Sequence, residues 1–512
     1  MLKLTFFRVF VRKLKHSNGK IYVQVVQKQP GRFLVVKSFG GTADEMLLQI
    51  LVDKAARWIS QQTGLQELDF SGSDVLVQKF MDAITSIKHA GYDLLLGPIF
   101  DEIGFNKIKA ELFRELVIAR VAFPKSKLKT TKFLYRYKQI DWDEDKLYRY
   151  LDKLFNTQKE AVQQISYLHT LKVLHDDISV VFYDVTTLYF EIDEEDELRK
   201  TGFSKEGKHQ NPQIVLGLLV SKGGYPLAYE IFEGNKFEGH TMLPVIDKFK
   251  AKYSLDKLVV IADSGLLSND NIIQLQQKGY EFIIGARIKN EKEKIKQKIL
   301  FLNLANGKSE VIDKGNLKLI VTYSEDRAKK DKFNREKGIR KLEKRIRSGR
   351  LTKSSINNRG YNKFLKLEGQ INVAFDTFKI EEDKKWDGLK GYLSNASLNK
   401  NQIIENYQHL WQIEKAFRIA KSDLKIRPVY HRLQRRIEAH ICISFAAYKV
   451  YKELERQLKE KKANISAAEA IEIADHIHQI TIVLPQSGKT VKRTLLQTEE
   501  QRNLAELFNF GC

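Results

Sequence analysis

The stretch SVVFYDVTTLYFE, residues 179–191, decides the fold class of this chain. It is an almost unbroken run of β-branched and aromatic residues, which is typical of a strand in the middle of a sheet. The single charge within its apolar run is Asp184. A carboxylate in such a strand is costly unless it is paired or bound to a metal ion. Asp184 is therefore the first candidate for a functional residue.

The residues that follow predict an α/β arrangement in the order β-β-β-α-β-α-β. Two more strands, QIVLGLLVS and YPLAYEIFEG, are joined by a Gly223-Gly224 turn. Helices and strands then alternate: helix 240–253, strand DKLVVIADSG, helix 268–278 and strand YEFIIGAR. The fourth strand ends in Asp263, and in open α/β sheets ligand chemistry gathers at the carboxyl ends of strands.

Size, charge and cysteine content narrow the class of protein. At 512 residues the chain is too long for one ordinary core, so several domains are expected. The net charge of +23 favours a polyanionic partner, either nucleic acid or an acidic membrane surface. No apolar run of about 18 residues or signal-peptide pattern is present. Two cysteines argue against a disulfide framework, so we expect a soluble, cytoplasmic protein that binds nucleic acid.

A second informative stretch is YQHLWQIEKAFRIAKSDLKIRPVYHRLQRR, residues 407–436, which is predicted to form one helix. Its predicted buried face consists of Leu410, Trp411, Ile413, Phe417, Ile419 and Ala420. Three cations follow Glu414 on one stripe, at +4, +7 and +11: Arg418, Lys421 and Lys425. Such a stripe suits a site that holds a metal ion and binds a polyanion. The alternative is a salt-bridged face exposed to solvent.

Asp184, Asp263 and Glu414 form the candidate catalytic set. Each alone could be a strand-end or helix-capping acid, but a sheet covered by a helix could bring the three together. Carboxylate oxygens are the ligands that Mg²⁺ or Mn²⁺ prefers. Two such ions can activate a water or a 3′-hydroxyl and stabilise the leaving oxygen of an in-line displacement at phosphorus, without a general base.

Three blocks of sequence carry a family resemblance. FYDVTTLYFE, VVIADSGLLSNDN, and KWDGLKGYLSNAS with the helix after it resemble bacterial insertion-sequence transposases of the DDE class, in the group with the YREK signature. Tyr407, Glu414 and Lys421 match the spacing of that signature, whereas Leu410 stands at its Arg position. Arg418, one turn after Glu414, could compensate for the missing arginine. The resemblance covers roughly residues 176–450.

The resemblance implies an RNase H-like mixed sheet with flanking helices, interrupted by a β-containing basic insertion. The 151 residues from Asp263 to Glu414 fit this insertion. It also implies that Asp184, Asp263 and Glu414 hold two Mg²⁺ or Mn²⁺ ions. The implied reaction is cut-and-paste transposition: cleavage of double-stranded DNA at terminal inverted repeats, a hairpin, and joining of 3′ ends to target DNA. A homodimer in the DNA complex and a place in the bacterial cytoplasm, with the nucleoid, are further implications.

Several side chains are expected to contact DNA. By the resemblance, Tyr407 and Lys421 contact phosphates near the cut, and an aromatic residue, Trp386 or Trp411, holds a flipped base. By charge and spacing the further candidates are Arg418 and Lys425.

Two basic segments add to these candidates. Residues 327–350 contain twelve Lys or Arg against three acids, which favours phosphate contact over a balanced solvated face. The segment PKSKLKTTKFLYRYK, 124–138, mixes lysines with aromatic residues, so it is either a DNA-backbone contact or an ordinary helical connector.

The chain is expected to divide into six parts. The strands KLTFFRVFVRKL, KIYVQVVQ and RFLVVKSF precede a helix at 43–62, whereas residues 75–172, including QKFMDAITSIKHA, are mostly helical. NLKLIVTYS and INVAFDTFKI are the expected strands of the insertion. The expected parts are a small β/α module (1–65), a mostly helical DNA-binding region (66–175), the first part of the RNase H-like core (176–290), a β-rich basic insertion (291–400), the second part of the core (401–465) and a C-terminal tail (466–512).

Two other functions stay open. A metal-dependent nuclease or resolvase of the same fold would cut DNA without joining it. A catalytically inactive, domesticated DNA-binding protein would keep the basic surface and lose the chemistry. The three intact acids argue against the second alternative, while Leu410 leaves room for it.

Overall fold

The computed structural model describes residues 9–510 apart from ten short gaps: 64–72, 176, 205–206, 256, 267, 349–350, 352–355, 358–359, 369–371 and 485–486. The chain divides into two compact units. The first comprises Met1–Lys88, His478–Leu496 and Gly511–Cys512, and the second comprises His89–Ile477 and Gln497–Phe510. Among the helices that the structure describes, none has the length and apolar character needed to cross a membrane.

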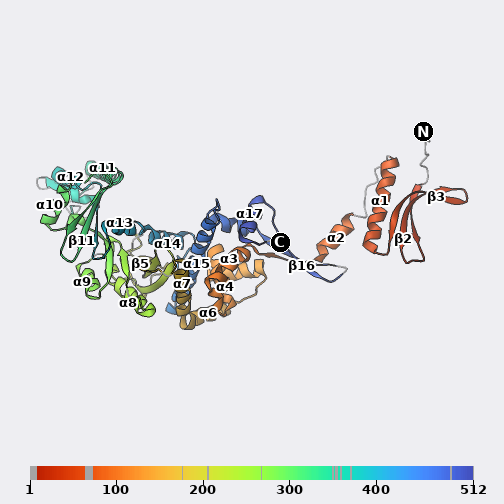
Figure 1. The fold of residues 1–512 in the computed structure, drawn as a ribbon, viewed down its shortest axis with the longest axis horizontal. Coiled ribbons are helices and arrows are strands. Elements are labelled where there is room, and N and C mark those ends of the chain that lie inside the picture. Colours follow the sequence, from red (N-terminus) through yellow and green to blue (C-terminus); the bar gives the residue numbers. More distant parts are fainter. Residues whose placement is uncertain are drawn as a thin grey trace. The chain divides into compact units, whose positions relative to one another are not determined.

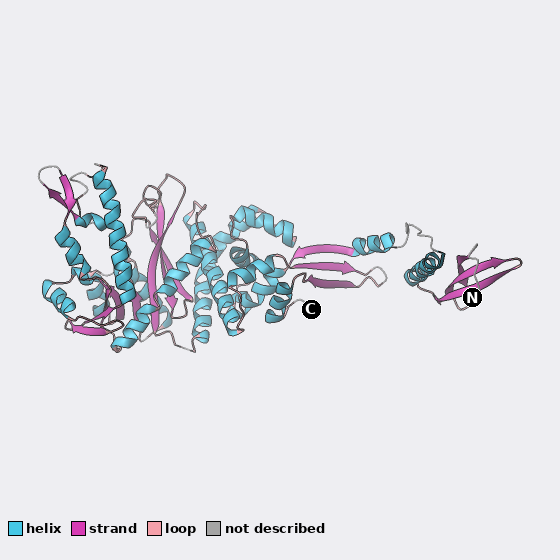
Figure 2. Ribbon diagram, turned by 90° about the horizontal axis from the view of Figure 1, so that it is seen from above, coloured by secondary structure: helices cyan, strands magenta, loops and turns pink. Residues whose placement is uncertain are grey.

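The first unit contains two three-stranded sheets, in the orders β1-β2-β3 and β16-β15-β4, and two helices (Figure 2). Helix α1 packs on one sheet, where Val23, Val25 and Ala55 form a small core. The elements are β1 (Val9–Lys15), β2 (Ile21–Gln29), β3 (Arg32–Thr42), α1 (Glu45–Thr63), α2 (Ser73–Ala83), β4 (Ile84–His89), β15 (His478–Val483) and β16 (Thr490–Leu495). The strands and helix predicted before residue 63 are therefore confirmed where the structure describes them, while the first half of KLTFFRVFVRKL, residues 3–8, lies outside the described residues.

The prediction that QKFMDAITSIKHA is helical throughout is wrong. The helix ends at Ala83, and Ile84–His89 forms β4, which lies beside β15 in the sheet. The Thr85 hydroxyl donates to the carbonyl of Thr481 at 3.2 Å. This pairing joins segments from opposite ends of the chain, so it outweighs the local helical pattern.

A helical layer dominates one part of the second unit (Figure 1). Its elements are α3 (Gly91–Ile103), α4 (Glu111–Ala122), α5 (Lys127–Phe133), α6 (Glu144–Lys153), α7 (Lys159–Val173), α15 (Gln434–Glu460), α16 (Ala467–Asp475) and α17 (Glu499–Phe508), with π-helical turns at Leu134–Lys138 and Leu154–Gln158 and a 3₁₀ turn at Phe105–Lys107. Helix α15 confirms the helix predicted from residue 435 onward. It is buried on nearly every side, because α3, α4, α6 and α7 all pack against it.

An eight-stranded sheet forms the rest of the core, in the order β10-β11-β14-β9-β8-β5-β6-β7. The predicted β-β-β-α-β-α-β order is confirmed by β5 (Val180–Tyr189), β6 (Gln213–Ser221), β7 (Pro226–Glu233), α8 (Met242–Tyr253), β8 (Val259–Ala262), α9 (Asn269–Gln277) and β9 (Glu281–Ala286), with 3₁₀ turns at Glu238–His240, Ser264–Leu266 and Ile288–Asn290. Strands β5, β8 and β9 run parallel, while β6 and β7 are antiparallel to their neighbours. This mixed sheet with flanking helices is the expected RNase H-like fold.

The segment between β9 and the glutamate helix extends this same sheet. It contains α10 (Glu293–Phe301), β10 (Ser309–Asp313), β11 (Lys318–Tyr323), α11 (Glu325–Arg347), a 3₁₀ turn (Gly360–Phe364), β12 (Leu365–Glu368), β13 (Asn372–Phe375), α12 (Thr377–Lys384) and β14 (Leu389–Ser394). Strand β14 pairs antiparallel with β9, which joins β10, β11 and β14 to the core sheet. Figure 1 shows the helices of this segment gathered beside β11.

The strand predicted for INVAFDTFKI is wrong in its second half. Strand β13 ends at Phe375, and the carboxylate of Asp376 accepts a hydrogen bond from the Lys379 amide at 3.1 Å. An aspartate at this position caps a helix, so the residues after it form α12 instead of continuing the strand.

The single helix predicted for residues 407–436 is also wrong. The structure has α13 (Lys400–Gln408), α14 (Trp411–Ser422) and then a loop before α15. Proline lacks a backbone N–H and restricts the residue before it, so Pro428 prevents a helix across this loop. Lys425 has φ +44° in the loop, which removes it from the predicted helical stripe.

Trp411 does not belong to the buried face predicted for it. It is the first residue of α14, and half of its surface is exposed. The chain turns at His409 and Leu410, so α14 does not continue the face of the helix before it. The buried face of α14 consists of Ile413, Ala416, Phe417 and Ile419. The other predicted face residues of α14 are buried or half-buried as expected.

Ile443 provides a test of α15 as the centre of the helical layer. Its side chain is fully buried, so Ile443→Ala should lower the free energy of unfolding by about 2–5 kcal/mol through lost contacts and a cavity. The exposed Lys459 on the same helix is the control, and Lys459→Ala should change stability by less than about 0.5 kcal/mol. Denaturant unfolding followed by circular dichroism measures both. Equal effects would contradict the central position of α15.

Candidate active site

The parallel pairing of β5 with β8 brings the first two acids together. Phe182 pairs with Ile261 and Tyr183 with Ala262. The next residue on each strand is Asp184 on β5 and Asp263 directly after β8. Neighbouring strands lie about 4.8 Å apart, so the two acids, 79 residues apart in sequence, are neighbours in space.

Both acids are on the face of the sheet that α14 covers. Side chains alternate between the faces of a strand. Phe182 and Ile261 belong to the core that includes α14, whereas Tyr183 and Ala262 belong to the core on the opposite face. Asp184 and Asp263 lie two residues after Phe182 and Ile261, so alternation places them on the same face of the sheet as these two core residues. Asp184 is half-buried and Asp263 is exposed, as expected for acids at the edge of this core.

Glu414 approaches the same place from α14. Helix α14 packs on β5 and β6 through Ile413, Ala416 and Phe417. Glu414, next to Ile413, is exposed. Burial lowers the pKa of Lys390 and nearby Arg327 adds to this, while the carboxylates of Asp263 and Glu414 oppose it. One lysine on β14 therefore lies within electrostatic reach of two of the three acids.

Tyr407 holds the second acid in place. Its hydroxyl donates to Asp263 Oδ1 at 3.3 Å, and the ring is buried. The Lys390 Nζ lies 4.6 Å from the centre of the Tyr407 ring. Burial raises the pKa of Tyr407, and the charge of Asp263 raises it further, so the hydroxyl stays a donor. Gly285 on β9 makes room, because a Cβ there would lie 2.5 Å from the hydroxyl oxygen.

Glu238 is a fourth acid beside the site, and sequence reasoning did not select it. The turn Glu238–His240 packs on the turn Ser264–Leu266. A Cβ on Gly265 would lie 4.0 Å from both Glu238 Oε2 and Asp263 Oδ2. In sequence, Glu238 lies in the mostly polar turn EGNKFEGH, residues 233–240, and no run of apolar residues surrounds it as one surrounds Asp184. Sequence reasoning did not select Lys390 either. The signal that could have identified it is a charged residue within an otherwise uncharged strand, β14.

The donor chemistry of these acids fits a divalent cation. Asp184, Asp263 and Glu414 offer carboxylate oxygens, which Mg²⁺ and Mn²⁺ prefer over nitrogen or sulfur. Their oxygens do not meet as a closed group: among the described residues, the group of three ligand atoms within 4.8 Å of one another is elsewhere. The three acids therefore offer suitable ligand atoms for a divalent cation, but these atoms are not gathered into one closed group.

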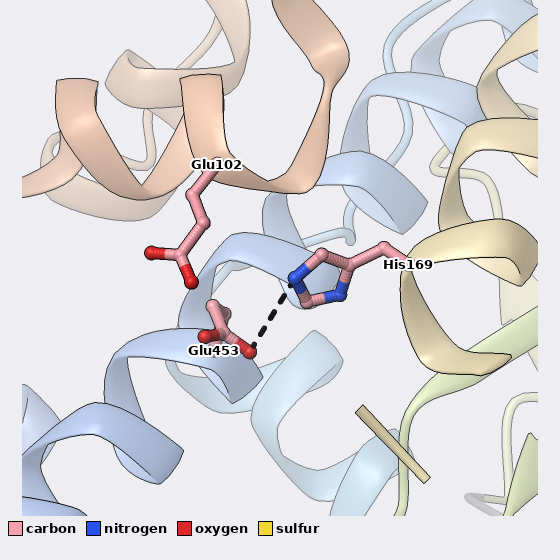
Figure 3. A group of neighbouring side chains, drawn as sticks. All are labelled: Glu102, His169 and Glu453. Atoms are coloured by element: carbon pink, nitrogen blue, oxygen red, sulfur yellow. Dashed lines mark ion pairs between the residues drawn. The ribbon is translucent and has the colours of Figure 1, made fainter. Parts of the chain in front are cut away.

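That other group consists of Glu102, His169 and Glu453, and it is a structural ion-pair network (Figure 3). Arg456 donates to both carboxylate oxygens of Glu453, with Nε at 2.9 and 3.0 Å. It also lies 3.7 Å from Glu102. Burial and nearby cations, first among them Lys449, lower the pKa of His169 to about 3. The cations already neutralise these acids, so the group does not suit a metal ion.

A cavity of about 470 Å³, lined by Ser264 and Lys390 among others, lies beside the candidate acids. This insertion cavity is lined by Ser264, Ala286, Arg287, Ile288, Lys289, Asn290, Arg327, Asp331, Asn334, Arg335, Tyr361, Asp383, Trp386, Asp387, Leu389, Lys390 and Gly391. Arg335 is held by Asp387 at 2.5 and 2.6 Å, and Lys289 by Asp383 at 2.7 Å. The structure thus joins the core sheet and the insertion around one cationic cavity.

The predicted DNA contacts fall into three environments. Tyr407 is buried against Asp263, and Trp386, 9% exposed, lines the insertion cavity. Arg418 is exposed on α14 one turn after Glu414, and Lys421 is half-buried. Lys425 lines a different cavity, together with residues of the helical layer.

Gly285→Ala tests the packing of Tyr407 on the sheet. The added methyl group meets the buried hydroxyl, so the variant should lose about 1–3 kcal/mol of stability. In a Tyr407→Phe background the oxygen is absent, and the same change should cost less. The difference, measured by denaturant unfolding of the four proteins, should be about 0.5 kcal/mol or more. If the effects of Gly285→Ala and Tyr407→Phe on stability simply add, the contact between position 285 and the Tyr407 hydroxyl is contradicted.

Comparison with known proteins identifies the family. The family described as "Transposase DDE domain" matches residues 175–449, which are 275 of the 512 residues. No curated protein sequence matches the chain. Among solved structures, the chain is similar to the piggyBac transposase synaptic complex with hairpin DNA, at 10% identity and a TM-score of 0.37, over 78% of this chain and 79% of that one. It is also similar to the Mos1 transposase paired-end complex with left transposon end, at 12% identity and a TM-score of 0.16, over 46% and 76%. Because the family match spans more than half of the sequence and contains all three acids, the chain belongs to the DDE transposase family.

Proposed function

We propose that the protein moves an insertion sequence by cutting its terminal inverted repeats and joining the 3′ ends to target DNA, with Asp184, Asp263 and Glu414 as the catalytic residues. The observation that carries this proposal is the pairing of β5 with β8, which makes Asp184 and Asp263 neighbours on the face covered by α14. The family match supports the reaction class, DNA cleavage and strand transfer.

Divalent cations belong to this proposal, since DDE transposases typically use them. Asp184, Asp263 and Glu414 are the residues that would hold Mg²⁺ or Mn²⁺. When bound, two such ions lower the pKa of the attacking water or 3′-hydroxyl and neutralise the charge that develops on the leaving oxygen. Glu238, next to Asp263, adds negative charge to the same place.

The chain's own groups orient the acids and the substrate. The Tyr407 hydroxyl donates to one oxygen of Asp263, Oδ1, and so restricts the orientation of this carboxylate. Lys390 offsets the repulsion between Asp263 and Glu414, and it lines the insertion cavity together with Arg287 and Arg327. These cations suit the phosphates next to the cut bond. Trp386, on the wall of the same cavity, suits a base that is turned out of the helix, as a hairpin pathway would require.

Membership of the bacterial YREK group is also part of the proposal. Tyr407, Glu414 and Lys421 keep the spacing of the signature, while Leu410 replaces its arginine. The Leu410 side chain is 7% exposed and belongs to the core under α14. Arg418, exposed on the same helix as Glu414, is the residue that takes over the phosphate contact. Two element ends must be processed together, so the protein acts on DNA as a dimer.

Removing any one catalytic carboxylate should abolish cleavage. Asp184→Asn, Asp263→Asn and Glu414→Gln keep the side-chain shape but weaken cation binding, so cleavage should fall by about 10³-fold or more. Glu405→Gln, at an exposed position of α13, is the matched control and should cleave normally. The assay uses the gene's own flanking DNA on a plasmid, with products resolved on denaturing gels. EDTA should stop the wild-type reaction.

Binding and joining are followed in the same assay. Intact DNA binding by the three variants assigns the acids to chemistry, and cleavage by any one of them would sink the assignment. Cuts without strand-transfer products would favour a nuclease or resolvase. Binding by the wild type without any cut would favour a domesticated DNA-binding protein.

A separate experiment tests whether Arg418 makes the phosphate contact that an arginine at position 410 would make in the family signature. Arg418→Gln should lower the slope of log affinity against log salt by about 0.9, the change expected for one lost phosphate contact. Leu410→Arg restores the signature, but it buries a cation in the core, so it should lower stability without raising cleavage. Lys459→Gln, exposed on α15, is the control for the salt slope. Faster cleavage by Leu410→Arg would contradict this role of Arg418.

A further inference from the structure

A second cavity, of about 480 Å³, lies between the helical layer and the loop after α14. Six cations line this basic cavity: Arg120, Lys125, Lys127, Lys129, Lys425 and Arg427. Among the described residues that line it there is no aspartate or glutamate. It lies outside the group of catalytic acids and outside the insertion cavity, and no step of the reaction above uses it.

Two of these cations are buried. Arg120 is 5% exposed and Lys127 is 6% exposed. The Arg120 guanidinium reaches only backbone carbonyls, those of Leu424 and Lys425, at 3.5 and 3.4 Å. The Lys127 ammonium has no hydrogen-bond or ion-pair partner in the part of the chain that the structure describes. A buried charge is ordinarily paired, so this pair of cations is incomplete without a further ligand.

The groups around them give no negative charge. Burial lowers the pKa of Lys127, and the charge of Arg120 lowers it further. Burial and the same two cations lower the pKa of His431 to about 3. They also hold the pKa of His440 well below its usual range. No carboxylate acts on any of these four groups in the opposite direction. The electrostatic potential in the cavity is therefore positive, and an anion is the ligand that it favours.

Nearby cations show what a paired arrangement looks like in this layer. Asp152 on α6 accepts hydrogen bonds from Arg436 Nε and Nη2 at 3.1 and 3.3 Å, and it lies 2.9 Å from Arg435 Nε. The fold thus supplies an acid to the arginines at the start of α15 and supplies none to Arg120 and Lys127. The two buried cations face the cavity instead.

We propose that the basic cavity binds a phosphate group of the DNA strand, with Lys127 and Arg120 at its floor and Lys125, Lys129 and Lys425 at its rim. This inference rests on the proposed function and adds a binding site to it. The connection to the active site is α14, which carries Glu414 in its first turn and leads into the loop that holds Lys425. From Glu414 to Ser422 the helix rises about 12 Å, at about 1.5 Å per residue.

The length of α14 predicts how far along the DNA strand the bound phosphate lies from the cut bond. One strand of DNA advances about 3.4 Å per nucleotide along the axis, so the bound phosphate should lie roughly three to five nucleotides from the cut bond. The exposed rim lysines would follow the same strand. A free phosphate or nucleotide offers the same chemistry without this distance from the cut bond, and the test below separates the two sources.

The test measures DNA binding by the full chain in EDTA, without cleavage, over a range of salt concentrations. The probe is a fluorescent duplex from the gene's flanking DNA, followed by anisotropy. Lys127→Met should weaken binding about tenfold at low salt, because a charge-assisted contact is lost. The slope of log affinity against log salt should fall by about 0.9. Lys109→Met, exposed in the same layer but outside the cavity, is the control and should match the wild type.

Stability separates a binding role from a structural one. Lys127→Met removes a buried, unpartnered charge, so its Tm should equal or exceed that of the wild type. Lys125→Met changes an exposed rim residue and cannot disturb the fold, so it decides the matter if Lys127→Met does not fold. It should weaken binding in the same direction, by a smaller factor.

Three outcomes would overturn the inference. One is wild-type affinity and salt slope in both Lys127→Met and Lys125→Met. Another is a Tm increase in inorganic phosphate that Lys127→Met abolishes while the DNA salt slope stays unchanged, which would assign the cavity to a free phosphate. The third is a wild-type protein that binds no DNA, which would overturn the proposed function too. A wild type that binds DNA without cutting it would count against the proposed function alone.

Discussion

The parallel pairing of β5 with β8 is the constraint on which the candidate active site depends. It sets Asp184 beside Asp263, and two carboxylates at strand spacing repel each other when both are ionised. The fold answers this repulsion from two directions. Tyr407 donates to Asp263 from α13, and Lys390 supplies a positive charge from β14. Because β14 belongs to the segment between β9 and the glutamate helix, this segment is a working part of the site.

The same pairing makes the position of the two acids a consequence of core packing. A shift of one residue in β5 or β8 would send an acid to the opposite face of the sheet. The apolar neighbours Phe182 and Ile261 fix the register, because each must stay in the core under α14. Gly285 extends the argument to β9, where the absence of a side chain lets the Tyr407 hydroxyl reach Asp263. Residues that never touch DNA therefore decide where the acids lie.

The sequence predicts the parts of this arrangement that leave a local signal. Strands β5 to β9 are runs of apolar residues, and Asp184 and Asp263 stand out as acids within or directly after such runs. The break between α13 and α14 has no proline or glycine to mark it, so residues 407–422 read as one helix and Trp411 as buried. Lys390 and Glu238 acquire their meaning only when β14 pairs with β9 and one turn packs on another. Contacts between residues far apart in the chain leave no trace in the local order of apolar and polar residues, so the sequence pattern does not predict them.

Two groups of like charge in the described part of the second unit lie near the two ends of α14. Acids meet beside its first turn, and buried cations meet at the loop that follows its last. Each group is unfavourable in the protein alone, since like charges repel and buried charges lose their hydration. Under the proposed function, DNA with its bound cations would relieve both at once, because phosphates would neutralise the lysines and arginines while metal ions would neutralise the carboxylates. Helix α14 thus separates the two sets of like charges, and under the proposed function the ligand that would satisfy them together is a metal-bound polyanion.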